Sequence, residues 1–211
     1  MDALKIKRLV LGMVRTNCYI IYNDKTKEGI IIDPASESNK ISDFVTEEKI
    51  QIKGIFLTHG HFDHIGGVCK YRDMYKVKVY CHEEESDIAS SRQLNLAEAF
   101  GDDVAVKPDE LLRDKETLEM CGFNIKVIHT PGHTKGSCCY LISEGEDKIL
   151  ISGDTLFAGS HGRTDFPTGS MAQIRDSIVN KLLCLDENII VYPGHELETS
   201  IGDEKPLWRL S

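Results

Sequence analysis

Four side chains that can bind a metal ion lie within six residues in the segment Thr-His-Gly-His-Phe-Asp-His, which spans residues 58–64. They are His59, His61, Asp63 and His64. Imidazole and carboxylate groups suit borderline divalent ions such as zinc, and four of them at this spacing can serve two adjacent sites. His59 and His61 can point one way, and Asp63 and His64 another. Because three histidines and an aspartate seldom gather by chance, we interpret the segment as a metal site.

Three later segments place a possible ligand in a glycine-containing turn directly after an apolar run. His133 lies in Thr-Pro-Gly-His-Thr, Asp154 in Ser-Gly-Asp-Thr, and His195 in Tyr-Pro-Gly-His. Loops that gather at the ends of neighbouring strands form one cleft. We therefore predict seven metal ligands: His59, His61, Asp63, His64, His133, Asp154 and His195.

Strand and helix patterns alternate around these turns. In the first half, strands are predicted at residues 5–11, 17–23, 29–34, 52–57 and 77–80, and helices at 38–49 and 65–75. The metal motif then joins the C-terminal end of the strand at 52–57 to the helix that follows. This alternation indicates a mixed α/β architecture with helices outside the sheet.

The second half continues the pattern after an ambiguous polar stretch. Residues 83–109 predict short helices and a long connection. Strands are expected at 117–129, with a break at Cys121-Gly122, and at 137–143, 148–152 and 188–192; a helix is expected at 171–183. We see no linker and no repeat, so we expect one domain over residues 1–211.

Composition limits the partners that this chain can have. Its 211 residues suffice for one buried core, and 41% hydrophobic and 28% charged residues describe an ordinary globular protein. A net charge of -9 argues against nucleic acid and against an anionic membrane surface as partners. No apolar run approaches the length of a membrane span, and the first residues lack the layout of a signal peptide. The composition leaves the oligomeric state open.

The cysteines indicate a reducing compartment. Their number, seven, is odd, and no two are spaced as Cys-x-x-Cys, so we expect no disulfide framework and a cytoplasmic location. Cys138 and Cys139 lie in an apolar run, so at least one is predicted to pack in the core.

The motifs His59-x-His61-x-Asp63-His64, Pro-Gly-His133-Thr, Gly-Asp154-Thr-Leu-Phe and Pro-Gly-His195, in this order, resemble the metallo-β-lactamase superfamily. Within it, the chain is similar to glyoxalase II (hydroxyacylglutathione hydrolase) and especially to its short single-domain relatives. The resemblance covers about Thr16 to Ile201 and implies a four-layer αβ/βα sandwich. It also implies that His59, His61 and His133 hold a first metal, that Asp63, His64 and His195 hold a second, and that Asp154 bridges both.

The resemblance further implies a hydrolase with two divalent metal ions, zinc being expected and iron or manganese possible. Two such ions can share a water, lower its pKa toward about 7, and deliver hydroxide to an acyl or thioester carbon of a small molecule. Asp63 is the predicted catalytic residue, which orients the nucleophile or moves a proton toward the leaving group.

Several residues near these motifs have two interpretations. Asp33, which follows a predicted strand, either fixes a histidine tautomer or is a plain turn residue. Arg163 and His161 lie in the loop after Asp154 and are candidate substrate-binding residues; alternatively, Arg163 pairs with Asp165 and only shapes the loop. We expect His82 to be exposed at the start of a helix, and His129 to pack or to support the metal loop.

The resemblance to glyoxalase II weakens near the C-terminus. Sixteen residues follow His195, which is too few for that enzyme's glutathione-binding domain, and Leu197 stands where a glutathione-binding tyrosine is usual. We therefore expect poor saturation by S-lactoylglutathione.

A different enzyme class shares part of the pattern. The run Gly-Arg163-Thr-Asp165-Phe also resembles the persulfide dioxygenases, which hold one iron at the positions of His59, His133 and Asp154. Two other readings are weaker. A non-enzymatic metal-binding module would gain no structural advantage from an aspartate that brings two metal ions together. The negative net charge argues against a nucleic-acid-processing enzyme.

Overall fold

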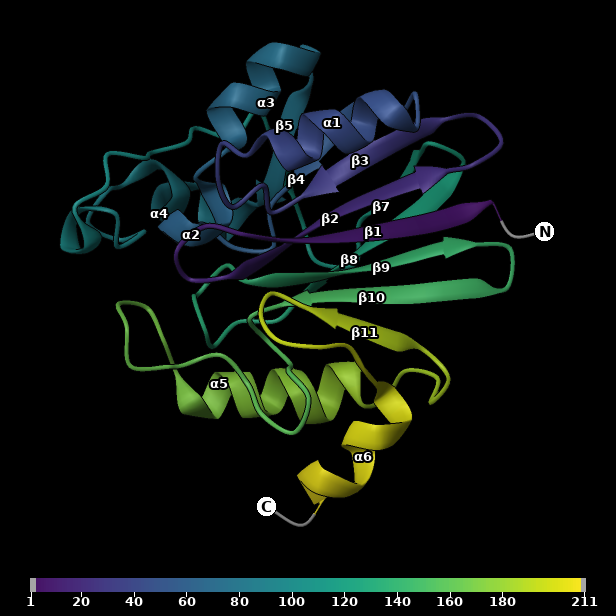
Figure 1. Cartoon of the computed structure of the whole chain (residues 1–211). Helices are drawn as coiled ribbons and strands as arrows, with labels where there is room; N and C mark the ends of the chain where they lie inside the picture. Colours follow the sequence, from purple (N-terminus) through teal and green to yellow (C-terminus); the bar gives the residue numbers. More distant parts are fainter. Residues whose placement is uncertain (1–2, 210–211) are drawn as a thin grey trace.

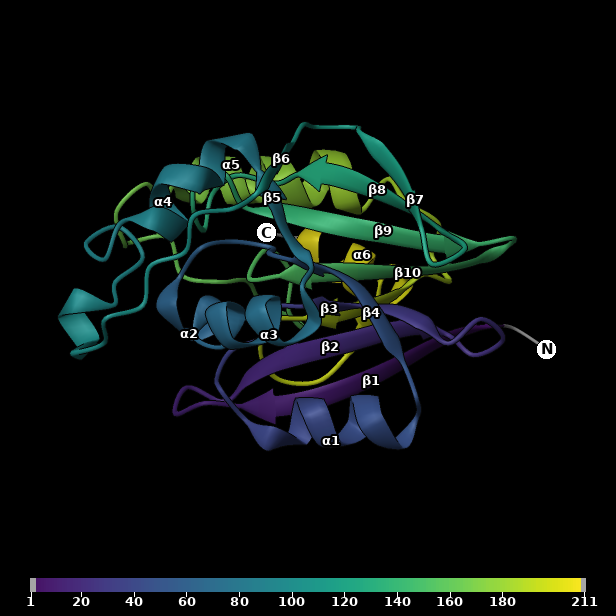
Figure 2. The same ribbon diagram turned by 90° about the horizontal axis from the view of Figure 1, so that it is seen from above.

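Two β-sheets packed face to face form the centre of the computed structural model, which describes residues 3–209 (Figure 1). Helices α1 (Asn39–Glu47) and α3 (Val68–Tyr75) cover the outer face of one sheet. Helices α5 (Met171–Asp176) and α6 (Ile201–Arg209) cover the outer face of the other (Figure 2). The order of layers is helix, sheet, sheet, helix, so the predicted α/β class and the four-layer αβ/βα sandwich in a single domain are confirmed.

The first sheet mixes both strand directions. Its order is β1 (Leu4–Leu11), β2 (Thr16–Asn23), β3 (Glu28–Ile32), β4 (Gln51–Phe56), β5 (Lys78–His82) and β6 (Glu110–Leu112). The first three strands are antiparallel, and β3 to β6 run parallel. Because parallel strands need a crossover connection, the chain passes through α1 and then α3 between them. The loops after β3 and β4 consequently leave the sheet at the same edge.

The second sheet is antiparallel except at one pair. Its order is β12 (Thr199–Ser200), β11 (Ile190–Pro193), β10 (Asp147–Gly153), β9 (Cys138–Glu144), β8 (Phe123–His129) and β7 (Thr117–Met120). Only β10 and β11 are parallel, and the crossover between them includes α5 and the π-helical segment Ser177–Leu182. Both strands therefore end side by side, and a predicted ligand follows each of them.

Alternation along the strands divides the core into layers. In β2, Tyr19 and Ile21 face the second sheet, whereas Cys18 and Ile20 pack under α1 and α3. Side chains of a strand point alternately to its two faces, so the middle of a strand that is buried on both faces is continuously apolar. Cys138 packs between the sheets and Cys139 under α5, so the prediction of a core cysteine is confirmed.

The structure corrects the predicted helix at 65–75. The segment forms two helices, α2 (Phe62–Ile65) and α3, separated at Gly66-Gly67. The break requires glycine, because a Cβ at Gly66 would lie 2.5 Å from the carbonyl oxygen of Ala35. The earlier helix start also places Asp63 and His64 on helical backbone rather than in a turn.

The remaining elements are short, and some were not predicted. The stretch 83–109 contains α4 (Ser86–Ser90) and the 3₁₀ turns Glu83–Glu85 and Glu98–Phe100, as expected. Strands β6 and β12 and helix α6 follow no pattern that the sequence made visible. Among residues 3–209, no helix combines the length and the apolar character needed to cross a bilayer.

Candidate metal centre

The loops that carry the seven predicted ligands meet at the edge where β4, β10 and β11 end. The motif from His59 to His64 follows β4, and His133 lies between β8 and β9. Asp154 and His195 come directly after β10 and after β11. The parallel pairing of β10 and β11 brings the last two ligands together although they are far apart in sequence.

His59, His61 and His133 form a buried set of ring nitrogens, here called the histidine group. His133 Nε2 lies 3.2 Å from His59 Nε2 and 2.9 Å from His61 Nδ1. His133 Nδ1 donates its proton to the Arg163 carbonyl oxygen at 2.7 Å, which leaves a lone pair on Nε2. His59 Nδ1 donates to Thr58 Oγ1 at 3.2 Å, because that hydroxyl gives its own proton to a carboxylate. Two lone pairs therefore face each other, which favours a cation between them.

The histidine group is electrically neutral in the absence of a metal. Burial lowers the pKa of all three imidazoles, and it brings the pKa of His61 to about 3. Desolvation disfavours the imidazolium form, and the neighbouring histidines add to this effect. Neutral imidazole is the form that binds metals, so no proton has to leave before an ion enters.

Asp63, His64 and His195 form a second set, here called the carboxylate group. His195 Nε2 lies 3.4 Å from Asp63 Oδ2, and His64 Nε2 lies 3.7 Å from the same oxygen. Thr16 Oγ1 donates a hydrogen bond to that oxygen at 2.7 Å. His64 is fully buried, whereas Asp63 and His195 are 14% and 20% exposed, so this group faces the surface.

The carboxylate group is charged. Burial raises the pKa of Asp63, but the charge of His64 and hydrogen bonds from His195 and Thr16 outweigh it and lower the pKa below its usual range. Burial lowers the pKa of His64, but three surrounding carboxylates outweigh it and raise the pKa well above normal. His64 therefore carries a proton that a metal ion would displace.

Asp154 lies between the two groups. Its Oδ2 is 3.5 Å from His133 Nε2 and 3.5 Å from His195 Nε2. Its Oδ1 lies 3.4 Å from His64 Nε2, and both atoms are buried without a hydrogen-bond partner. The position before His195 must be glycine, because a Cβ at Gly194 would lie 2.2 Å from Asp154 Oδ1. One carboxylate is thus placed to serve both groups.

The donor set fits divalent metal ions. In each group the nitrogen and oxygen atoms that can bind an ion lie within 4.8 Å of one another. Buried polar atoms are normally hydrogen-bonded, so bare atoms at His64 Nε2 and Asp154 Oδ1 call for another partner. Imidazole and carboxylate together suit zinc, iron and manganese.

Asp33 supports the carboxylate group from behind. Its Oδ2 accepts a hydrogen bond from His64 Nδ1 at 2.9 Å and one from Thr58 Oγ1 at 2.6 Å, and its Oδ1 accepts from Thr58 N at 2.8 Å. These bonds fix the ring so that His64 Nε2 faces the centre. Of the two interpretations of Asp33, the structure confirms the one in which it fixes a histidine.

Glu85 supports the histidine group and was not predicted. It is fully buried and accepts hydrogen bonds from Gly60 N and from Thr134 Oγ1, each at 2.7 Å. Gly60 lies between two motif histidines, and Thr134 follows His133, so one carboxylate holds both loops. Burial raises the pKa of Glu85 to about 7, although these hydrogen bonds oppose the shift.

The sequence family described as the metallo-beta-lactamase superfamily matches this chain over residues 11–195. The chain belongs to the metallo-β-lactamase superfamily. Members of this superfamily are typically metal-dependent hydrolases, and their fold binds divalent metal ions. The matched range contains the six residues of the two groups and Asp154, which lies between them.

Two relatives within the superfamily resemble this chain along nearly its whole length. It is 34% identical over 204 residues to the probable metallo-hydrolase YqgX of Bacillus subtilis, which covers 96% of this chain and 95% of that protein. It is also 34% identical over 205 residues to the hydroxyacylglutathione hydrolase GloC of Haemophilus influenzae, with the same two coverages of 96% and 95%.

Solved structures show the same superfamily fold. The BLEG-1 B3 metallo-beta-lactamase has a TM-score of 0.89 and 38% identity, covering 96% of this chain and 97% of that chain. The di-iron-bound form of TTHA1623 has a TM-score of 0.80 and 29% identity, with coverages of 94% and 96%. ETHE1 from Myxococcus xanthus has a TM-score of 0.78 and 26% identity, with coverages of 95% and 81%.

A pocket of about 370 Å³, here called the metal pocket, opens over the superfamily motifs. Both groups contribute to its lining, and the rest of its wall is largely apolar. The apolar lining residues are Val14, Phe62, Leu96, Phe100, Phe157 and Phe166. Pockets of this kind take an apolar part of a ligand and orient it with a few polar groups.

The two candidate substrate-binding residues are placed differently. Arg163 lines the metal pocket, but its Nε and Nη2 donate to the Asp165 carboxylate at 2.7 Å each, and its guanidinium stacks on Phe166 at 3.7 Å. The alternative of an internal pair is therefore what the structure shows. His161 does not line the metal pocket: its Nδ1 donates to the Gly162 carbonyl oxygen, and its ring lies near Trp208 in a neighbouring pocket.

His82 and His129 stack on each other, with ring centroids 4.0 Å apart. The prediction that His82 is exposed was wrong, because it is only 3% exposed, although it does cap a 3₁₀ turn by accepting from Glu84 N. His129 packs as expected, and its Nε2 donates to the Lys135 carbonyl oxygen at 2.8 Å. Neither ring belongs to the two groups.

Proposed function

We propose that this chain hydrolyses small acyl thioesters with the help of two divalent metal ions. The observation that carries the proposal is the pair of donor groups with Asp154 between them. The likeness to the hydroxyacylglutathione hydrolase GloC supports the thioester class, and the likeness to YqgX supports hydrolysis in general.

Each group would hold one ion. His59, His61 and His133 would hold the first, Asp63, His64 and His195 the second, and Asp154 would contact both. When bound, the ions would polarise the acyl carbonyl and lower the pKa of a water molecule between them. Zinc is the proposed metal, with iron or manganese as alternatives; the di-iron form of TTHA1623 supports iron among these.

Asp63 is the proposed proton-transfer residue. Its Oδ2 is held by Thr16 and lies at the partly exposed side of the centre, where a water molecule and a substrate carbonyl can meet. In hydrolysis the acyl C–S bond breaks, a C–O bond forms, and the proton from water goes to the departing sulfur. In this proposal, Asp63 would accept that proton and return it to sulfur.

The apolar wall of the metal pocket would position the substrate and limit water. Phe62 stacks on Phe100 with centroids 4.7 Å apart, and Phe166 lies edge-on to His61 at 5.9 Å. An acyl chain packed on these rings loses its hydration, and the reacting carbon stays beside the two groups. No serine or cysteine nucleophile is required.

A mononuclear-iron persulfide dioxygenase is the alternative. It rests on the Gly-Arg163-Thr-Asp165-Phe run and on the likeness to ETHE1. Such an enzyme would need only His59, His133 and Asp154. Here the carboxylate group completes a second donor set, with Asp33 holding its histidine, and this argues for two ions.

The test is a set of assays on one preparation whose metal content has been measured. Thioester loss, oxygen uptake with glutathione persulfide, and opening of a β-lactam such as nitrocefin are followed in parallel. We expect about two metal ions per chain and thioester turnover. Oxygen uptake with one iron per chain would establish the dioxygenase. Opening of the β-lactam without thioester loss would instead indicate a β-lactamase, the class to which BLEG-1 is assigned.

A further inference from the structure

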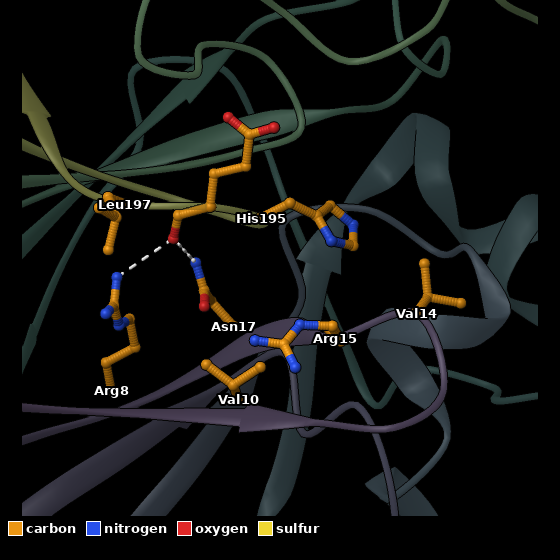
Figure 3. A pocket seen from close by; sticks show the side chains of 8 residues that line it. Arg8, Val10, Val14, Arg15, Asn17, His195 and Leu197 are labelled. Carbon is orange, nitrogen blue, oxygen red and sulfur yellow. Dashed lines mark hydrogen bonds between the residues drawn. The ribbon is translucent and has the colours of Figure 1, made fainter.

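A second pocket, here called the arginine pocket, lies beside the metal pocket and has a volume of about 510 Å³ (Figure 3). Three residues, Val14, His195 and Glu196, line both pockets. The two cavities therefore adjoin around a member of the carboxylate group. The remaining lining residues are Arg8, Val10, Arg15, Asn17 and Leu197.

Arg15 ends the turn that joins β1 to β2. Its backbone N–H donates to the Gly12 carbonyl oxygen at 3.4 Å, and its φ of 62° is left-handed. The next residue, Thr16, is buried and donates to Asp63 Oδ2. Adjacent Cα atoms are about 3.8 Å apart. The backbone of Arg15 is therefore fixed beside Thr16, which itself is hydrogen-bonded to the carboxylate group.

Arg8 and Asn17 hold the wall that carries His195. Arg8 Nη1 and Asn17 Nδ2 donate to the same carbonyl oxygen of Glu196, at 3.1 Å and 3.0 Å, as the dashed lines in Figure 3 show. Asn17 N also donates to the Gly194 carbonyl oxygen at 2.7 Å. These bonds preorganise the pocket before any ligand arrives.

The charges in the two pockets differ in one respect. Arg163 in the metal pocket forms an ion pair with Asp165. In the arginine pocket, Arg8 Nη1 lies 3.2 Å from Glu198 Oε2 and forms an ion pair with it. Arg15 is exposed and forms no ion pair or hydrogen bond through its side chain within residues 3–209. In a chain with a net charge of -9, an unpaired guanidinium beside a metal pocket is a local attraction for anions.

We propose that the arginine pocket binds the anionic end of the substrate, a carboxylate or a phosphate, while the thioester lies over the two donor groups. The inference rests on the proposed function and narrows it to thioesters with a charged end. Arg15 supplies the free guanidinium, whose planar fork matches either anion, whereas Arg8 in the same pocket is paired with Glu198 and holds the pocket wall. Val10 and Leu197 offer apolar surface to the stem that links the charged end to the thioester.

The kinetic test compares three thioesters with the same propionyl group. Glutathione supplies carboxylates, coenzyme A supplies phosphates, and N-acetylcysteamine supplies no charge. Arg15→Gln should raise KM about tenfold for the charged thioester that uses the pocket, with kcat changed less than about twofold. KM for the neutral thioester should stay constant, and Arg15→Lys should restore part of the loss. Lys5→Gln is the matched control, because it removes the same charge from β1 at an exposed position outside both pockets.

A binding measurement separates this inference from the proposed function. S-methylglutathione and S-methyl-coenzyme A, which cannot be hydrolysed, are titrated into the metal-loaded protein by calorimetry. We expect at least one to bind the wild type about tenfold more tightly than Arg15→Gln. Equal binding, or no binding of either compound, would refute the anion subsite even in an active hydrolase. Arg15-dependent binding without turnover of any thioester would refute the hydrolase and leave the subsite standing.

Discussion

The two donor groups of the candidate metal centre contain three proposed ligands each, but they differ in charge and access. The histidine group is buried, and burial keeps its rings neutral. In the carboxylate group the pKa of Asp63 is lowered and that of His64 is raised, which favours the charged form of both, and one member, His195, lines both pockets. A neutral, closed set of ligands is suited to holding an ion, whereas a charged and open set is suited to moving protons and meeting substrate.

The supports behind the two groups differ in the same sense. Glu85 binds backbone and hydroxyl donors of two loops and touches no histidine of its group. Asp33 bonds directly to His64 and so acts on the electronic state of a ligand. One support fixes where the loops lie, and the other holds the Nδ1 side of His64 so that Nε2 faces the centre.

Removing a ligand from the histidine group should have the largest effect. In His59→Ala the ion of the buried group loses one of its four proposed ligands, and the loop after β4 loses its anchor. We expect activity to fall on the order of 100-fold or more, and the thermal unfolding midpoint to fall to that of the chelator-treated wild type. Metal analysis and calorimetry check this. Retention of two ions and full activity would show that the histidine group does not bind a metal ion.

Changing the carboxylate group should reduce turnover more than metal content. Asp63→Asn keeps the shape of the side chain and the hydrogen bond from Thr16 but cannot take a proton. We expect kcat to fall roughly 100-fold or more, the typical range for loss of an acid–base group, with the first ion retained. Steady-state kinetics and metal analysis on the same sample measure both quantities. An unchanged kcat would contradict the role of Asp63.

Acid should empty the two groups in sequence. The pKa of His64 is raised, so a proton competes with the metal there at a higher pH. The pKa values of His59, His61 and His133 are lowered, so protons compete with the metal at that group only at a lower pH. As pH falls, we therefore expect one ion to leave the carboxylate group before the other leaves the histidine group. Metal release during an acid titration should show two steps, and a single step for both ions would contradict the difference between the groups.

Glu85 should affect stability more than chemistry. In the metal-free protein its pKa is raised from 4.5 to about 7, so the folded state holds a proton that the unfolded state has released between these values. Wild type should lose up to roughly 3 kcal/mol relative to Glu85→Gln as pH rises through this window, and the difference should be constant above it. Urea unfolding at pH 4, 6 and 8 measures this. A stability difference that does not change with pH would mean that folding does not raise the pKa of Glu85.

The motifs made most of the fold predictable, and the seven predicted ligands do lie close together. The ligands follow strands whose apolar alternation is visible in the sequence, and short strand-end loops leave little freedom. Glu85 escaped prediction because it lies in a run of three glutamates, and nothing in the run distinguishes the buried one. His82 was mispredicted for a similar reason, since its burial depends on a ring from β8 that is distant in sequence.

The sequence also did not show which arginines near the two pockets are paired with a carboxylate. Arg163 and Arg15 both lie in a connection between strands and directly precede a threonine, yet one is neutralised by Asp165 and the other has no partner among the described residues. The loop backbone decides this difference, and local composition does not report it. Helix α6 and strand β12 also lacked a signal, because the pairing of β12 with β11 depends on tertiary contacts.

If the proposed function holds, the turn between β1 and β2 would allow the substrate range to change independently of the two donor groups. Met13, Val14 and Arg15 project from the turn and contribute little to the core, with Met13 89% exposed, whereas the very next residue is tied to Asp63. Substitutions in the turn would therefore change the walls of the adjoining pockets at little cost in folding, whereas a substitution of Thr16 would remove the hydrogen bond to Asp63. A library confined to these three positions would sample new specificities on an unaltered reaction machinery.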